Sequence, residues 1–124
     1  MKNILVIDDE ELITKSLLKL LTTEGYHATV VKTGKEAIEK VKEGNFDLIV
    51  SDVRMPGIDG IETIKQIRSE LKKANRRQIP EIVITGYADK EQYETAMTEL
   101  KVKDYIFKPF ERAEFLKAIK NTIG

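Results

Sequence analysis

Apolar residues along the chain follow two alternating periods, and this alternation predicts five strands and five helices. Short runs rich in apolar and β-branched residues occur at 4–7, 28–31, 46–51, 82–84 and 105–107. Such runs are typical of strands that are buried on both faces. After each run, apolar residues recur at spacings of three and four, which is the period of an amphipathic helix. The predicted order is therefore strand, helix, strand, helix throughout.

Each predicted helix has an apolar face, and several have recognisable ends. The faces consist of Ile13, Leu17, Leu20 and Leu21; Ala37, Ile38 and Val41; Ile61, Ile64, Ile67 and Leu71; Tyr93, Ala96, Met97 and Leu100; and Phe115, Leu116, Ile119 and Ile123. Thr33, Asp59 and Asp89 precede three of these faces and are residues that cap helix N-termini. Gly25 and Gly44 follow the first two faces, where glycine commonly ends a helix.

This order of elements indicates the fold class. Strands that alternate with helices through short connections form a parallel sheet with right-handed crossovers and helices on both faces. The fold is thus predicted to be α/β, a three-layer (βα)5 sandwich. No repeat, linker or low-complexity segment interrupts the pattern, so residues 1–124 are expected to form a single domain. Open sheets of this kind bind ligands beyond the carboxyl ends of their strands.

Polar side chains stand at those strand ends. Asp8 and Asp9 follow the first strand, Asp52 the third, Thr85 the fourth and Lys108 the fifth. Carboxylates held together repel one another, and a hard divalent cation such as Mg²⁺ relieves the repulsion. A carboxylate beside such a cation can attack a phosphoryl group, whose oxygens Thr85 and Lys108 could bind. The strand ends therefore predict Mg²⁺-dependent phosphoryl chemistry at Asp52.

Composition and charge narrow the classes of function. The 124 residues are 41% hydrophobic and 34% charged, as in ordinary globular domains. The 21 basic and 21 acidic residues balance, so binding of nucleic acid or of an anionic membrane by this domain is not expected. No cysteine is present, which excludes thiolate chemistry. His27, the single histidine, falls on a predicted strand and is interpreted as structural. A cytoplasmic location is the default expectation.

The combined motifs resemble the receiver domain of two-component response regulators. The matching residues are Asp8-Asp9, Asp52 with Met55-Pro56-Gly57 and Asp59-Gly60, Thr85, and Lys108-Pro109-Phe110. The match covers essentially the whole chain. The resemblance implies a CheY-like, flavodoxin-like sheet of strand order 2-1-3-4-5. No output domain is recognised, and a standalone regulator and a receiver cut from a longer protein both remain open.

The resemblance also implies a phosphoacceptor and a metal site. Asp52 would take a phosphoryl group from the phosphohistidine of a sensor histidine kinase or a histidine phosphotransfer protein. Asp9, Asp52 and the backbone carbonyl of Arg54 would bind Mg²⁺ directly, and Mn²⁺ could substitute. Asp8 would act mainly through a metal-bound water. Only weak self-catalysed phosphotransfer and autodephosphorylation are implied, so the chain is not expected to be a dedicated enzyme.

A conformational switch is implied as well. Thr85 and Lys108 would hold the phosphoryl oxygens, and the peptide bond between Lys108 and Pro109 would be cis. Tyr105 would turn inward as Thr85 moves toward the phosphate. The surface formed by the fourth helix, fifth strand and fifth helix, roughly Asp89 to Ile123, would then signal to a downstream partner or a missing output domain. A phosphorylation-dependent homodimer through this surface is also compatible with the resemblance.

Some positions depart from the commonest pattern of the family. Lys101-Val102 stands where many members have Gly-Ala. If Lys101 must take a left-handed backbone, the cost would be on the order of 1 kcal/mol. Gly86 stands where alanine is common. Arg54 and Tyr87 flank the phosphate position and are expected to tune hydrolysis; Arg54 could screen the phosphoryl group or pair with a nearby acid.

Three other hypotheses compete with the receiver. A receiver-like scaffold would bind its partner without phosphorylation, although it would not need all the site residues. An aspartyl-phosphate phosphohydrolase or phosphotransferase usually has its nucleophile and general acid two residues apart, whereas Asp8 is followed by Asp9-Glu10. A flavodoxin would require a hydroxyl- and glycine-rich phosphate loop after the first strand. Mg²⁺-dependent labelling of Asp52 separates these hypotheses.

Overall fold

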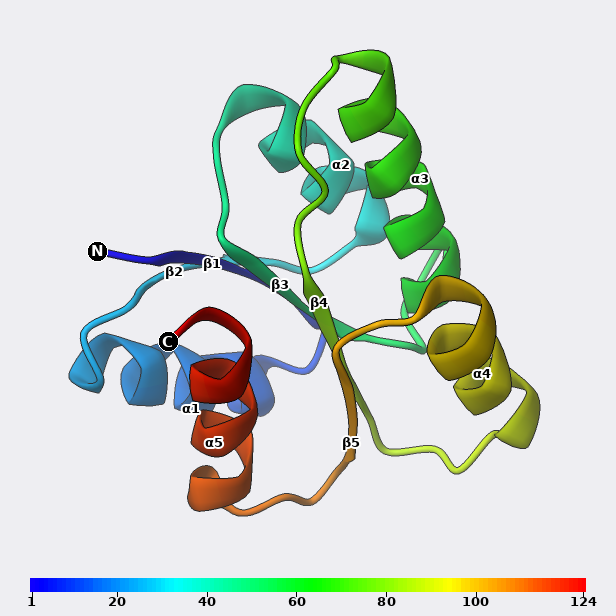
Figure 1. The fold of residues 1–124 in the computed structure, drawn as a ribbon. Helices are drawn as coiled ribbons and strands as arrows, with labels where there is room; N and C mark the ends of the chain where they lie inside the picture. The colour runs from blue at the N-terminus through cyan, green and yellow to red at the C-terminus, as the bar shows by residue number, and fades with distance from the viewer.

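A five-stranded parallel sheet with the order β2-β1-β3-β4-β5 forms the middle layer of the protein (Figure 1). The computed structural model describes residues 1–124. The strands are β1 (Asn3–Ile7), β2 (His27–Val31), β3 (Leu48–Asp52), β4 (Glu81–Thr85) and β5 (Asp104–Phe107). Every pairing between neighbouring strands is parallel. The predicted fold and strand order are confirmed.

Helices cover both faces of this sheet (Figure 1). They are α1 (Glu11–Thr23), α2 (Gly34–Glu43), α3 (Gly60–Lys73), α4 (Lys90–Glu94) and α5 (Arg112–Ile123), with the π-helix η1 (Thr95–Leu100) continuing α4. The helices α1 and α5 pack on one face, while α2, α3 and η1 pack on the other. None of the helices is long and apolar enough to cross a membrane.

Alternate strand residues supply two separate cores, because successive side chains of a strand point to opposite faces. Ile4, Val6 and Val50 join α1 and α5 in one core, in which Phe115 is fully buried. The opposite core combines residues of β1 and β3 with α2 and α3. A third cluster lies between α3, β4, β5 and η1, and it contains Tyr105.

The predicted helix caps at Thr33, Asp59 and Asp89 are confirmed. Each side chain accepts a hydrogen bond from the backbone N–H three residues later, at 3.1, 2.8 and 3.1 Å respectively. These bonds satisfy donors that have no partner within the helix. They fix where α2, α3 and α4 begin, and α3 and α4 begin at the edge of the sheet where β3 and β4 end.

Two predicted elements differ from those observed. The third strand starts at Leu48 rather than residue 46, because the Asp47 carboxylate turns to accept a 2.7 Å bond from the Asn3 N–H. The predicted α-helix after Asp89 is α-helical for five residues and then widens into a six-residue π-helix. The wide turn ends at Lys101, whose backbone is left-handed with φ 55° and ψ 49°.

Replacing Lys101 by glycine is therefore expected to stabilise the protein by about 1 kcal/mol, since glycine adopts the left-handed region without a clash at Cβ. Asn75 also has a positive φ, 56°. Because asparagine tolerates this region, Asn75→Gly should give a smaller gain. Urea unfolding of both variants checks the order of the two effects; a loss of stability in Lys101→Gly would contradict the expectation.

Two arginines form hydrogen bonds at the end of the sheet where the strands begin, opposite the predicted site. Arg68 on α3 makes two 2.8 Å bonds to Glu81, whose side chain is only 2% exposed. Arg76 follows the C-terminal end of α3. Its guanidinium donates to the carbonyls of Val41 and Gly44 at 2.7 and 2.8 Å, so it caps the C-terminus of α2.

Candidate functional site

Asp52 is the last residue of β3 and only 4% exposed. Its Oδ1 accepts a 2.7 Å bond from the Val53 N–H, and its Oδ2 lies 3.2 Å from the Lys108 Nζ. Burial raises the pKa of Asp52, and the charge of Asp8 adds to that effect, while Lys108 opposes it. The Asp52 carboxylate is therefore fixed in position, and its negative charge is poorly solvated. These are properties expected of a nucleophile that reacts beside a cation.

Lys108 joins three carboxylates with one ammonium group. Its Nζ donates to Asp8 Oδ2 at 2.8 Å, to Glu10 Oε1 at 3.1 Å and to Asp52 Oδ2 at 3.2 Å. Burial alone would lower the pKa of Lys108, but the hydrogen bond and charge of Asp8, followed by Asp52 and Glu10, raise it above its usual value. The ammonium is consequently charged at any physiological pH. The peptide bond from Lys108 to Pro109 is cis.

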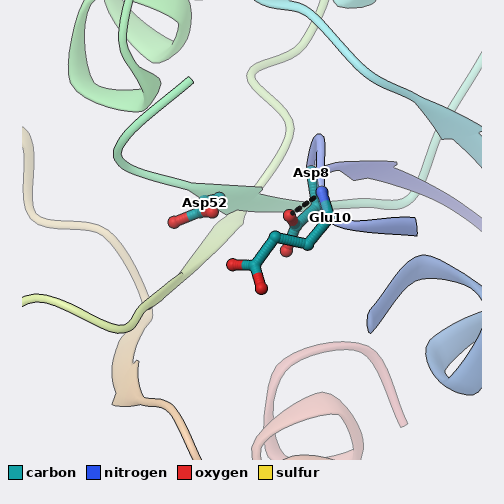
Figure 2. A group of neighbouring side chains, drawn as sticks. All are labelled: Asp8, Glu10 and Asp52. Atoms are coloured by element: carbon teal, nitrogen blue, oxygen red, sulfur yellow. Dashed lines mark hydrogen bonds between the residues drawn. The ribbon is translucent and has the colours of Figure 1, made fainter. Parts of the chain in front are cut away.

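The acidic side of the site is drawn in Figure 2, which shows Asp8, Glu10 and Asp52 around a common space. Asp8 is completely buried, and its Oδ1 accepts a 2.9 Å bond from the Glu10 N–H. One oxygen from each of these three carboxylates lies within 4.8 Å of the others. Oxygen atoms in such a group are the ligands that Mg²⁺ prefers, so the donor set fits the implied metal.

The structure does not bring Asp9 into this group. Asp9 is exposed, and the gathered carboxylates are those of Asp8, Glu10 and Asp52. Glu10 was not predicted as a site residue. The sequence signal was present, because residues 8–11 are all acidic, but the turn between β1 and α1 decides which of them face the site.

Thr85 ends β4, the strand beside β3, and is fully buried. Its Oγ1 accepts a 3.2 Å bond from the Tyr87 N–H. Asp52 pairs with Ile84 in the register of β3 and β4, so Thr85 stands one residue beyond Asp52 on the neighbouring strand. The backbone N–H of Lys108 donates to the Thr85 carbonyl at 2.7 Å, which ties the two predicted phosphate ligands together.

Arg54 and Tyr87 form a stacked pair at the same edge of the sheet. The guanidinium carbon of Arg54 lies 4.0 Å from the centroid of the Tyr87 ring, which is 52% exposed. No ion pair includes Arg54. Of the two interpretations left open by the sequence, pairing with a nearby acid is therefore not observed. The cation–π contact was not predicted.

Tyr105 points into the protein. It is 8% exposed, and its hydroxyl has no hydrogen-bond partner. Its ring packs edge-on against Tyr93 at 4.9 Å and against Phe107 at 5.4 Å between centroids. Burial raises the pKa of Tyr105, and the charges of Asp89 and Asp52 add to it.

His27, interpreted as structural, is an exposed residue at the start of β2, distant from these strand ends.

A family model described as the response regulator receiver domain matches residues 4–120. The chain belongs to the response regulator receiver domain family. This receiver domain is similar to the response regulator RR06 of Streptococcus pneumoniae, with 36% identity over 98% of this chain and 52% of that protein. It is also similar to the transcriptional regulatory protein ResD of Bacillus subtilis, with 41% identity over 94% of this chain and 46% of ResD. The chain thus spans about half the length of these curated relatives.

Solved structures give the same assignment for the receiver domain. TrrA of Thermotoga maritima, a response regulator solved in complex with Mg²⁺-BeF, has a TM-score of 0.82 and 34% identity, over 98% of this chain and 99% of that one. TrrA has also been solved in complex with the histidine kinase ThkA, where the similarity has the same TM-score of 0.82 and covers 100% of both chains. A CheY-like receiver domain of Methanospirillum hungatei has a TM-score of 0.88 and 27% identity, over 99% of this chain and 94% of that one.

Proposed function

We propose that Asp52 accepts a phosphoryl group from the phosphohistidine of a partner histidine kinase or phosphotransfer protein. The observation that carries this proposal is the buried Asp52 carboxylate, whose Oδ2 lies 3.2 Å from the Lys108 ammonium at the edge where Asp8 and Thr85 also stand. An oxygen of Asp52 forms the new bond to phosphorus. The bond from phosphorus to the donor nitrogen breaks, and the imidazole keeps the electron pair.

The residues proposed to hold Mg²⁺ are Asp8, Asp9 and Asp52 with the carbonyl of Arg54, and Mn²⁺ could replace it. The exposed Asp9 side chain would have to turn toward Asp8 and Asp52 to do so. When bound, the cation would offset negative charge on both the carboxylate and the incoming phosphoryl group. The protein supplies two further contributions. Lys108 carries a permanent positive charge to the phosphoryl oxygens. Burial excludes bulk water, which strengthens each of these interactions.

Switching follows from the same geometry. A phosphoryl group adds up to about two negative charges, so it favours any conformer that brings the Thr85 hydroxyl toward it. The Thr85 hydroxyl, which accepts a bond from the Tyr87 N–H, would then donate its own hydrogen to a phosphoryl oxygen. Tyr105 is paired with Val83, two residues before Thr85, and would respond. Tyr93 and Phe107, which contact Tyr105, are 40% and 45% exposed, so the change would reach the proposed output surface formed by α4, β5 and α5.

A kinase partner would approach over α1, which starts directly after the acidic turn. Leu12 and Leu18 are exposed large apolar residues of this helix, at 83% and 40%. Exposed leucines next to a charged site are suited to contact with the apolar side of a partner helix. The kinase complex formed by the similar protein TrrA supports a partner of this class.

The test is incubation of the purified protein with acetyl phosphate, with Mg²⁺ and with a chelator, followed by intact mass measurement. A phosphate-sized adduct that forms only with the metal is expected. A folded protein that binds Mg²⁺ but never gains the adduct would contradict the proposal and favour the phosphorylation-independent scaffold.

Replacing Tyr87 by alanine is expected to shorten the lifetime of the phosphorylated form about threefold. The Tyr87 ring holds the Arg54 guanidinium beside the phosphate position, and an exposed contact of this kind contributes about 0.5–1 kcal/mol. Tyr87→Phe keeps the ring face and should leave the lifetime unchanged. Decay of the mass adduct after removal of the donor measures the lifetime, and equal effects of both substitutions would contradict a role for the stack.

A further inference from the structure

Glu10 sends its side chain to the site instead of capping a helix. It occupies the N-cap position of α1, yet its carboxylate makes no capping bond there. Its Oε1 lies 3.1 Å from the Lys108 Nζ, while its backbone N–H donates to Asp8 at 2.9 Å. The Glu10 side chain is 59% exposed, whereas those of its two acidic neighbours in the site are almost fully buried. Figure 2 shows the Glu10 carboxylate in the region between Asp8 and Asp52.

The bonding capacity of Lys108 is fully used in this arrangement. An ammonium group has three N–H donors and no acceptor. The Lys108 Nζ has three carboxylate partners, Asp8, Glu10 and Asp52. Phosphorylation removes the carboxylate charge of Asp52 and so weakens one contact, but movement of the ammonium toward the phosphoryl oxygens also requires it to leave Asp8 or Glu10. Asp8 is buried and bonded twice, so it is held firmly, whereas the exposed Glu10 carboxylate can be hydrated as it leaves.

We propose that Glu10 is a positioning residue that competes with the phosphoryl group for the Lys108 ammonium. This inference rests on the proposed function of Asp52 as phosphoacceptor. In the unphosphorylated protein Glu10 holds Lys108 against the carboxylates. After phosphorylation its negative charge draws Lys108 away from the phosphoryl oxygens. Glu10 thereby favours the unphosphorylated form.

The test compares Glu10→Gln with the natural protein, with fluoroberyllate as the phosphoryl mimic. The Mg²⁺ concentration is raised until it no longer changes the result, which removes any effect of Glu10 on cation affinity. Glu10→Gln is expected to bind fluoroberyllate about three times more tightly, as befits the loss of one partly exposed charge contact. Titration followed by NMR shifts of residues near Thr85 measures the dissociation constant.

Glu11→Gln is the matched control, because it makes the same change of charge one residue away. Glu11 lies 3.8 Å from Lys32, with a side chain 68% exposed, and has no contact with the site. It should leave the affinity unchanged. Equal affinities of Glu10→Gln and the natural protein, or an equal shift in both variants, would overturn the proposal.

A second pair of variants tests whether Glu10 acts through Lys108. In a Lys108→Met background, the effect of Glu10→Gln should shrink to that of the Glu11 control. A shift of undiminished size would show that Glu10 acts without Lys108 and would overturn the positioning role. A natural protein that takes up neither fluoroberyllate nor phosphate would instead overturn the proposed function, and this inference with it.

Discussion

Asp52→Asn is expected to abolish the phosphate adduct completely and at the same time to raise the stability of the fold. Asparagine keeps the shape of the side chain, including an oxygen that can accept the 2.7 Å bond from Val53, but it lacks the nucleophilic carboxylate. Because Lys108 keeps its contacts with Asp8 and Glu10, the site should otherwise remain intact. Intact mass after incubation with acetyl phosphate and Mg²⁺ gives the first result.

The gain in stability follows from the raised pKa of Asp52. An acid with a higher pKa in the folded than in the unfolded state destabilises the fold once it is ionised. This loss of stability is absent well below the ordinary pKa of 3.8, grows as pH rises above that value, and is complete once the pH exceeds the raised pKa of the folded state. The difference in free energy of unfolding between Asp52→Asn and the natural protein should therefore be smallest in acid and grow as the pH is raised.

Denaturant unfolding at several pH values provides the comparison. A less stable Asp52→Asn at pH 7 would mean that the attraction of Lys108 for the ionised carboxylate outweighs its burial. An adduct that persists in this variant would place the phosphoacceptor elsewhere.

Gly60→Ala is expected to lower the free energy of unfolding by about 3 kcal/mol, since overpacking of this kind forces the backbone to move. A Cβ at Gly60 would lie 1.9 Å from the carbonyl oxygen of Asp52 and 2.9 Å from the Cα of Val53. The Gly60 N–H also donates to the Val53 carbonyl at 2.7 Å. The first turn of α3 is thus pressed against the backbone that positions Asp52, and phosphorylation should slow along with the loss of stability.

Gly86→Ala serves as the control for this experiment. A Cβ at Gly86 would meet no atom within 4 Å, and its backbone is not left-handed. Alanine there should leave stability unchanged or raise it by up to about 1 kcal/mol through the unfolded state. Urea unfolding of the two variants measures both effects. Equal free energies of unfolding for Gly60→Ala and Gly86→Ala would show that the backbone around residue 60 moves to accommodate the Cβ without loss of stability.

The sequence predicted the sheet and most of the site because both depend on position along strands. Asp52, Thr85 and Lys108 follow apolar runs, and the ends of parallel strands must share an edge. The choice between Asp9 and Glu10 depends on the dihedral angles of one turn, which the run of four acidic residues does not specify. The turn leaves Asp9 exposed and sends Glu10 to Lys108.

Other features escaped prediction because they depend on contacts between distant or competing groups. The apolar spacing of residues 93–100 fits an α-helix. The π-helix is recognised only from backbone bonds such as that from the Lys101 N–H to the Ala96 carbonyl, five residues earlier. The Arg68–Glu81 pair joins residues 13 positions apart on different elements. Glu81 is a single acid directly before the apolar residues of β4, and this pattern does not indicate that its side chain is buried and paired with Arg68.

That ion pair fixes β4 at one end only. Glu81, the first residue of the strand, is clamped by both arms of Arg68, whereas Thr85 at the other end leads into the exposed residues 86–88. Amide hydrogen exchange along this segment should accordingly be slow over 82–84 and fast over 86–88. Because Glu81 holds the start of β4, we expect a displacement of Thr85 to affect β5 rather than the start of its own strand. In the register of β4 and β5, Thr85 is paired with Phe107 and Val83 with Tyr105.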